Sequence, residues 1–313
     1  MKHDHKHDHA GGCPHDALNN KGRVLLFSIV LNLIFVVIEF IYGFISNSTA
    51  LMADAGHNAS DVLGLLLAWG AVILSRKQPS QRYTYGFRST SILAALGNAA
   101  LLLVASGAIA WEAVHRISQP PMVASLTVII VAAAGIVING LTAWLLMKGS
   151  KEDLNIRGAY LHMLADTAVS LAVVFAGAAM FYSGWYWLDP IISLAIVVVI
   201  VAGTWGLLRD SMKLALNAVP GQINEAAIDA YLRQLDGVTD IHDLHIWGLS
   251  TTENALTVHL VMPGGHPGDA FMDSVEATLK QQHSIHHCTL QIEHGTTHHA
   301  CSLAMTGPGR HRH

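Results

Sequence analysis

The stretch VASLTVIIVAAAGIVINGLTAWLLM, residues 123–147, contains no charged side chain. A helix needs about 20 mostly apolar residues to cross the hydrocarbon core of a bilayer. Similar runs lie on both sides of it, and the six runs together cover residues 24–45, 50–74, 91–114, 123–147, 158–182 and 190–208. A large soluble helical core is the alternative interpretation, but six runs of this length do not fit inside one soluble domain. The sequence therefore predicts six transmembrane helices.

The composition of the whole chain agrees with this prediction. Of its 313 residues, 52% are hydrophobic and 13% are charged, and the mean hydropathy is +0.40. A soluble domain carries about a quarter charged residues. The formal net charge of −4 argues against a nucleic-acid binder, which would need a basic surface. Three cysteines are too few for a disulfide scaffold, whereas the 20 histidines are an excess and give the first chemical clue.

Lys and Arg residues indicate the orientation of the helices, because they collect on the cytoplasmic side of a membrane. They occur in the N-terminal tail, between the second and third runs, between the fourth and fifth, and after the sixth. The loops on the opposite side contain only Arg116. Both termini are therefore expected in the cytoplasm. The first run follows a polar tail, which is not the pattern of a cleaved signal peptide.

The composition becomes mixed after residue 208, which indicates a second, soluble domain. Its pattern predicts a helix, two strands, a helix and a strand over residues 223–235, 239–249, 255–262, 268–282 and 289–294. This αββαβ order is typical of a small ferredoxin-like α+β domain with its helices on one face of the sheet. The expected domains are a His-rich cytoplasmic tail (1–22), a six-helix transmembrane domain (23–208), a cytoplasmic metal-binding α+β domain (209–295) and a disordered His-containing tail (296–313).

Two of the predicted spans contain ionisable residues, which cost roughly 2.5–3.5 kcal/mol each at the centre of a bilayer and therefore require a functional explanation. The second run contains His57 and Asp61, and the fifth contains His162 and Asp166. A spacing of four residues places each pair on one helix face, one turn apart. Asp54 lies three residues before His57 on the same face and is a candidate accessory ligand.

Two imidazoles and two carboxylates make the four ligands that Zn²⁺ prefers in a tetrahedral site. The carboxylates cancel the charge of the ion, whereas the empty site would hold a net charge of about −2, which protons relieve. Imidazole must be neutral to bind metal and titrates near pH 6.5, so metal and protons compete. This competition is the physical basis of a metal/proton antiporter. The simpler alternative is that each His–Asp pair forms a hydrogen bond within its own helix.

Two further acids in the spans have simpler explanations. Glu39 in the first run is expected to pack against Asn98 or Asn139, and a place on a proton path is the alternative. The pair Asp189-Pro190 is expected to begin the last span, with Asp189 as the cap of that helix.

Four motifs together resemble the cation diffusion facilitator family, close to its bacterial zinc transporters, over roughly residues 20–295. The motifs are Ala50–His57 with Asp61, Arg82–Gly86, Leu161-His162 with Asp166, and His242–Trp247. The resemblance implies a homodimer in the bacterial inner membrane that exports divalent cations in exchange for protons, and that is not an enzyme. The transport site that it implies consists of His57, Asp61, His162 and Asp166. His57 at its position resembles zinc-preferring members, with Cd²⁺, Co²⁺ and Ni²⁺ as further candidate ions.

The resemblance also implies a metal site in the cytoplasmic domain, where it would sense cytosolic zinc and tighten the dimer. The residues that match this site are His242, His259, His286 and Glu293. An ordinary polar surface is the alternative. Side chains alternate between the two faces of a strand. His242 and His245 are three residues apart, so they are expected on opposite faces, and His245 is expected to support Trp247 rather than to share a site.

The tract HDHKHDH at residues 3–9 and the C-terminal histidines are candidate metal-binding tracts, with a solvated tail of weak affinity as the alternative. Two other functions remain open beside the antiporter. A membrane-embedded zinc sensor would change the shape of the dimer without transport. An intramembrane metalloenzyme is disfavoured, because the sequence contains neither His-Glu-x-x-His nor Gly-x-Ser-x-Gly.

Overall fold

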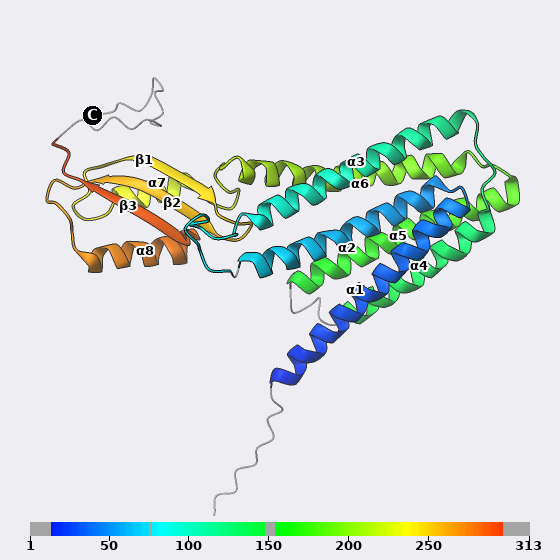
Figure 1. The fold of residues 1–313 in the computed structure, drawn as a ribbon, viewed down its shortest axis with the longest axis horizontal. Helices are drawn as coiled ribbons and strands as arrows, with labels where there is room; N and C mark the ends of the chain where they lie inside the picture. The colour runs from blue at the N-terminus through cyan, green and yellow to red at the C-terminus, as the bar shows by residue number, and fades with distance from the viewer. Residues whose placement is uncertain (1–13, 76, 148–153, 297–313) are drawn as a thin grey trace, which may run out of the picture. The chain divides into compact units, whose positions relative to one another are not determined.

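The structure is a computed structural model that describes residues 14–75, 77–147 and 154–296 (Figure 1). The predicted metal-binding tracts at residues 3–9 and near the C-terminus lie outside the described residues. The chain divides into two compact units, one of Met1–Leu63 with Leu101–Gly203 and the other of Gly64–Ala100 with Thr204–His313. Three of the helices described below each contribute residues to both units.

Six long helices come first in the described part of the chain, before the helices and strands of the second domain. They are α1 (Pro14–Ile45), α2 (Thr49–Ser75), α3 (Thr90–Ser118), α4 (Ser125–Leu146), α5 (Leu154–Ser183) and α6 (Leu188–Ala215). Each of the six predicted runs corresponds to one of these helices. Within the described residues, α3, α4, α5 and α6 contain stretches long and apolar enough to cross a membrane, and α1 contributes a shorter apolar stretch, Val30–Ile45. Helix α2 carries the ionisable residues Asp54, His57 and Asp61.

Small residues bring the helices of the first unit close together. A Cβ atom added to Gly135 of α4 would lie 2.8 Å from Phe35 Cζ and 3.1 Å from Ser170 Oγ. One added to Gly177 of α5 would lie 2.8 Å from Ile129 Cγ1. Close backbone approach is a main source of packing energy between membrane helices, because lipid tails are as apolar as the helices themselves. The apolar core of this unit includes Ala53, Leu102, Val128, Val173, Met180 and Ile196.

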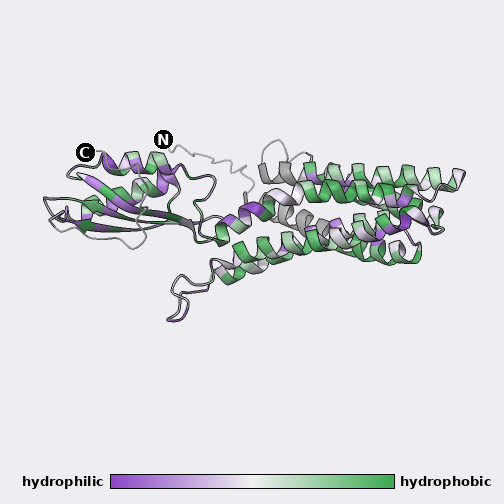
Figure 2. Ribbon diagram, turned by 90° about the horizontal axis from the view of Figure 1, so that it is seen from above, coloured by the Kyte–Doolittle hydropathy of each residue, from purple (hydrophilic) through white to green (hydrophobic). Residues whose placement is uncertain are grey.

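The outer surface of these helices is also largely apolar, and Figure 2 shows that hydrophobic residues predominate along their coloured parts, with hydrophilic residues among them. Val137 of α4 and Val198 of α6 are 66% and 67% exposed. An apolar surface of this extent is unfavourable in water and is expected where lipid surrounds the helices. The helices α1 to α6 therefore form a helical transmembrane domain.

The second domain consists of α7 (Glu225–Arg233), β1 (Asp240–Gly248), β2 (Asn254–Val261), α8 (Asp269–His283) and β3 (His287–Glu293). The strands form a three-stranded sheet of order β1-β2-β3, in which β2 is antiparallel to β1 and parallel to β3. Its core joins both helices to one face of the sheet through Ile228, Leu232, Leu256, Val258, Leu260, Val275 and Leu279. The predicted αββαβ order is confirmed. Because strand residues alternate, Thr257 and His259 of β2 lie on the other face.

Candidate metal sites

The structure brings His57 and Asp61 of α2 together with His162 and Asp166 of α5, a group that we call the quartet. The Nε2 atom of His57 lies 3.8 Å from Asp61 Oδ2 and 3.4 Å from Asp166 Oδ1. The Nε2 atom of His162 lies 3.0 Å from Asp61 Oδ2 and 3.6 Å from Asp166 Oδ2. Each imidazole therefore reaches both carboxylates, one on its own helix and one on the other helix.

The distances within the quartet suit a tetrahedral metal ion. Zn–N and Zn–O bonds of about 2.1 Å place neighbouring ligand atoms of a tetrahedron about 3.4 Å apart. The four N···O distances of the quartet, 3.0, 3.4, 3.6 and 3.8 Å, scatter around this value. Ligand atoms of His57, Asp61 and Asp166 all lie within 4.8 Å of one another. Asp61 Oδ2 and Asp166 Oδ1 are buried atoms, and each lies against an imidazole Nε2 atom of the quartet.

Burial differs across the quartet. The side chain of Asp166 is 2% exposed and that of His57 is 22% exposed. The side chains of Asp61 and His162 are 32% and 39% exposed. Asp166 is therefore the most buried member of the quartet, and Asp61 and His162 are its most accessible members.

Asp54 does not join the quartet, although it shares a helix face with His57. Its Oδ2 atom accepts a hydrogen bond from Ser170 Oγ of α5 at 3.1 Å. Glu39 of α1 accepts a hydrogen bond from Asn58 Nδ2 at 3.0 Å, and not from either of the asparagines expected on the third and fourth spans. Both acids are 0% exposed. Glu39 thus bonds to a residue of α2, and its packing against Asn98 or Asn139 stays a prediction.

Asp189 also has a role other than the expected one. Its carboxylate accepts hydrogen bonds from the backbone N–H of Thr49 at 2.6 Å, from Thr49 Oγ1 at 2.8 Å and from Ser48 Oγ. These donors lie at the N-terminus of α2, where backbone N–H groups lack partners within the helix. Asp189 therefore caps α2 and not α6, on which it lies. At 1% exposure, the bond network between the two helix ends is shielded from solvent.

In the cytoplasmic domain, His242, His259 and Glu293 come together, and we call them the trio. Glu293 Oε1 lies 2.8 Å from His259 Nδ1, and Glu293 Oε2 lies 3.4 Å from His242 Nε2. One ligand atom of each residue lies within 4.8 Å of the others. Gln291, which shares a face of β3 with Glu293, donates a hydrogen bond from Nε2 to Glu293 Oε1 at 2.8 Å. The trio is thus a set of three metal-ligand groups with one supporting amide.

The expectation that His242 and His245 face opposite ways is wrong, because β1 contains a bulge between them. His242 pairs with His259 and His245 pairs with Thr257, so three steps along β1 match two steps along β2. The extra residue shifts the alternation by one position. His242 and His245 therefore lie on the same face of the sheet. The bulge contains Asp243, whose φ of 51° lies in the left-handed region.

Asp243 is the residue of this site that the sequence analysis missed. Its Oδ1 atom lies 3.1 Å from His245 Nε2, and its Oδ2 atom lies 3.7 Å from His259 Nε2. The carboxylate therefore connects His245 to the trio. A signal for the bulge exists in the apolar pattern, since Ile241 and Ile246 both belong to the core. Residues five apart cannot share a face of a regular strand.

The structure does not bring His286 to the trio. Its Nδ1 atom accepts a hydrogen bond from the backbone N–H of Asn254 at 3.2 Å. Along the ladder of β2 and β3, Glu293 pairs with Val261, at the opposite end of β2 from Asn254. Seven residues of extended chain span about 23 Å, so His286 and Glu293 are too far apart to bind one ion.

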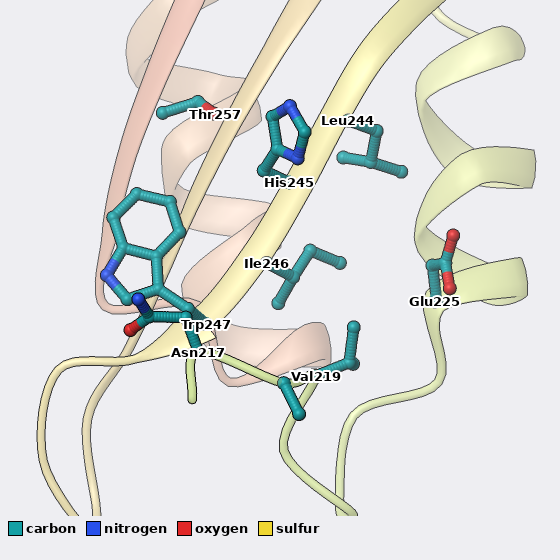
Figure 3. A pocket seen from close by; sticks show the side chains of 9 residues that line it. Asn217, Val219, Glu225, Leu244, His245, Ile246, Trp247 and Thr257 are labelled. Atoms are coloured by element: carbon teal, nitrogen blue, oxygen red, sulfur yellow. The ribbon is translucent and has the colours of Figure 1, made fainter. Parts of the chain in front are cut away.

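A cavity of about 530 Å³ lies beside the second half of β1 (Figure 3). Its lining residues include Asn217, Val219, Glu225, Leu244, His245, Trp247 and Thr257. His245 and Trp247 both face it, which agrees with the expected proximity of these two side chains. Within the part of the chain that the structure describes, two groups of three metal-ligand side chains come close enough to hold one ion, namely the quartet without His162 and the trio.

The fold and the two clusters define a class of protein, a multi-pass membrane protein with two groups of side chains of the kinds that bind metal ions. Comparison with family models specifies it further. The cation efflux transmembrane domain matches residues 25–214, and the cation efflux protein cytoplasmic domain matches residues 220–295. The chain therefore belongs to the cation efflux family, the cation diffusion facilitators that its motifs resemble. Members of this family are transporters and not enzymes.

Curated relatives match nearly the full length of the chain. A "Cadmium, cobalt and zinc/H(+)-K(+) antiporter" of Bacillus velezensis is 34% identical over 318 residues, covering 99% of each chain. The "Zinc transporter ZitB" of Escherichia coli is 33% identical over 312 residues, covering 98% of this chain and 99% of the relative. The "Metal cation efflux system protein CzcD" of Cupriavidus metallidurans is 31% identical over 290 residues, covering 92% and 89%. Metal cation efflux is thus the general activity of this protein.

Proposed function

We propose that the protein exports zinc from the cytoplasm in exchange for protons, and that the quartet is its transport site. The observation that carries this proposal is the convergence of two imidazoles and two carboxylates from α2 and α5, with N···O distances of 3.0–3.8 Å. The printed names of two relatives, a zinc transporter and a zinc/H(+)-K(+) antiporter, support the same metal and counter-ion. Cadmium and cobalt, which the second name includes, are further proposed substrates.

The charges of the quartet explain why metal and protons exchange with each other. A bound dication is neutralised by Asp61 and Asp166. When the ion leaves, the two carboxylates remain together in a poorly solvated place, which favours uptake of protons. His57 and His162 contact both carboxylates and are the natural acceptors, because imidazole titrates near neutral pH. A protonated imidazole cannot coordinate metal, so each form of the quartet excludes the other.

We infer that the trio is a second metal site, with a regulatory role in a homodimer. Two imidazoles and one carboxylate leave a fourth position of a tetrahedral ion free for water or for another donor. The trio side chains are 15–34% exposed, so cytosolic zinc can reach them directly. On the distribution of Lys and Arg, we assign both termini and the cytoplasmic domain to the inner side of the bacterial inner membrane.

Transport by purified protein in sealed liposomes tests the proposal. An imposed pH gradient should drive zinc across the membrane, and Asp166→Asn should reduce the flux to that of protein-free liposomes. Asp210→Asn is the matched control, because this acid on α6 is 64% exposed and lies outside the quartet. Normal flux in Asp166→Asn would overturn the transport site. A zinc-dependent change of shape without any flux in the wild-type protein would overturn the antiporter and favour a zinc sensor.

A further inference from the structure

A second buried acid pair lies beside the quartet. Glu39 of α1 and Asp54 of α2 are both 0% exposed. Glu39 bonds to Asn58, which follows Asp54 by four residues and so lies one turn away on the same face of α2, and this places the two carboxyl groups side by side. One oxygen of each has a donor, since Glu39 Oε2 accepts from Asn58 at 3.0 Å and Asp54 Oδ2 accepts from Ser170 at 3.1 Å. The other oxygens, Glu39 Oε1 and Asp54 Oδ1, are buried without a donor in the described part of the chain.

A proton is the ligand that this arrangement fits. Ionised carboxylates only accept hydrogen bonds, so two of them can bond to each other only if one carries a proton. One shared proton satisfies both of the oxygens that lack a donor. A dication would find only two ligand oxygens here and no imidazole, which is a poor site compared with the quartet.

Within the described residues, neither acid of the pair forms a hydrogen bond or an ion pair with a Lys or Arg side chain, so no fixed positive charge there lets both acids ionise. The charged groups that act on it are Asp166 of α5, a further acid, and His57 of α2, which acts on Asp54. Helix α4, which packs against α1 and α5, has no titratable residue between Ser125 and Leu146. The remaining titratable members of the neighbouring quartet are Asp61 and His162. Close carboxylates without a nearby cation favour binding of a proton.

The position of the pair links it to the quartet. Asp54 precedes His57 by three residues on α2, and Ser170 follows Asp166 by four residues on α5. Both displacements amount to about one helical turn. Both run toward the end of the bundle where α1 connects to α2 and α5 connects to α6. In the proposed orientation this end faces the outer solution, from which protons move inward during export.

We propose that Glu39 and Asp54 hold one proton between them and relay it to the quartet during transport. This proposal rests on the proposed zinc/proton antiport. The proton leaves the shared carboxyl pair for the imidazole of His57, the proposed proton acceptor of the quartet nearest to Asp54 along α2, as the metal departs. The pair then takes up another proton from the outer solution. Glu39 and Asp54 thereby bind the counter-ion, while the metal stays with the quartet.

Infrared difference spectroscopy on the full-length protein tests the shared proton without any transport. Metal-free wild-type protein at neutral pH should show the C=O stretching band of a buried protonated carboxylic acid. The substitution Glu39→Gln should remove this band, whereas Glu112→Gln, the same change at a 51% exposed side chain of α3, should leave it unchanged. A wild-type protein without such a band, or a band that survives in Glu39→Gln and in Asp54→Asn, would overturn the shared proton.

Two flux measurements test the relay. Uptake of zinc driven by a pH gradient should fall about tenfold or more in Glu39→Gln, because an amide cannot carry the proton. Exchange of zinc for zinc at equal pH on both sides, which moves no net proton, should continue at about the wild-type rate. Glu39→Asp, which retains a carboxyl group, should recover part of the driven uptake, and Glu112→Gln should alter neither rate.

The outcomes separate this inference from the antiport on which it rests. Driven uptake at the wild-type rate in Glu39→Gln would overturn the relay. Loss of both driven uptake and exchange in Glu39→Gln would also overturn it, because the pair would then serve the metal itself. If the wild-type protein moved zinc without any response to pH, the antiport would fail, and the infrared result would still decide whether the pair holds a proton.

Discussion

The quartet and the trio use the same ligand chemistry on different scaffolds. In the quartet, two carboxylates and two imidazoles stand on two helices, and its buried acid Asp166 is 2% exposed. In the trio, one carboxylate and two imidazoles stand on three strands, and Glu293 is 17% exposed. Removing a dication leaves two uncompensated carboxylates at the quartet but only one at the trio. The comparison favours rapid exchange of metal for protons at the quartet and simple reversible occupancy at the trio.

The largest expected effect separates the two sites by transport. Asp61→Asn removes a carboxylate that both imidazoles of the quartet contact, and we expect it to lower zinc flux by about 100-fold. Glu293→Gln removes the only carboxylate of the trio and should lower the flux no more than about threefold, because occupancy of a regulatory site modulates transport. Initial rates of zinc uptake into liposomes measure both. Equal losses in the two variants would make the trio part of the transport path.

The second prediction concerns the reactivity of the Cys288 thiol in the cytoplasmic domain. Burial raises the pKa of the Cys288 thiol on β3 to about 11, and the charge of Glu276 adds to the effect. A thiol with this pKa is neutral at pH 8, with about 100-fold less thiolate than one of pKa about 9. In a protein carrying Cys13→Ser and Cys301→Ser, alkylation of Cys288 should therefore be about 100-fold slower than that of a free cysteine. Rapid alkylation at pH 8 would show that the Cys288 thiol is not held in the buried environment that raises its pKa.

The third prediction measures the affinity of the trio. In an Asp61→Asn background, which removes transport, His259→Ala should weaken zinc binding to the cytoplasmic domain about tenfold or more, because one ligand is lost. His286→Ala is the matched control, since this imidazole bonds to Asn254 and lies away from the trio. Titration calorimetry on the full-length variants, which share the same tails, measures the difference. An equal loss in His286→Ala would restore that residue to the site.

The smallest expected effect tests the bulge that orders the trio. Asp243 has a φ of 51°, a conformation that Asn and Asp tolerate and that costs other residues about 1–2 kcal/mol. We expect Asp243→Ala to destabilise the cytoplasmic domain by about 1 kcal/mol and Asp243→Asn by clearly less. Hydrogen exchange of the β1 amides in the full-length protein measures the change. Equal destabilisation by both substitutions would indicate that the carboxylate charge, rather than the backbone conformation, holds the bulge.

The geometry of the quartet was accessible from sequence because helical spacing is regular. His57 with Asp61, and His162 with Asp166, share a helix face whatever surrounds them. Helical spacing does not reveal that α2 lies beside α5, and the structure adds this information. The partner of Glu39 could not be predicted from helical spacing, because its contact with Asn58 depends on how α1 lies against α2. No pattern within a single helix encodes that neighbour.

The trio was accessible only in part, because strand patterns fail where a strand is irregular. His259 and Glu293 follow the alternation of regular strands, and their place on one face could be inferred. The bulge at Asp243 changes the alternation of β1, so His245 was assigned to the wrong face. His286 was assigned to the site from the family resemblance, and its distance from Glu293 follows from the pairing of β2 with β3, which the spacing of residues does not reveal.

Asp189 fixes one end of α2, because its buried carboxylate ties the first turn of that helix to the start of α6. A movement of α2 relative to α6 that preserves these bonds must turn α2 about Thr49 instead of sliding it along its axis. Displacement in such a rotation grows with distance from the pivot. Asp61 lies about 18 Å along the helix from Thr49 and Asp54 about 8 Å, so the metal ligand travels roughly twice as far as the acid that precedes it.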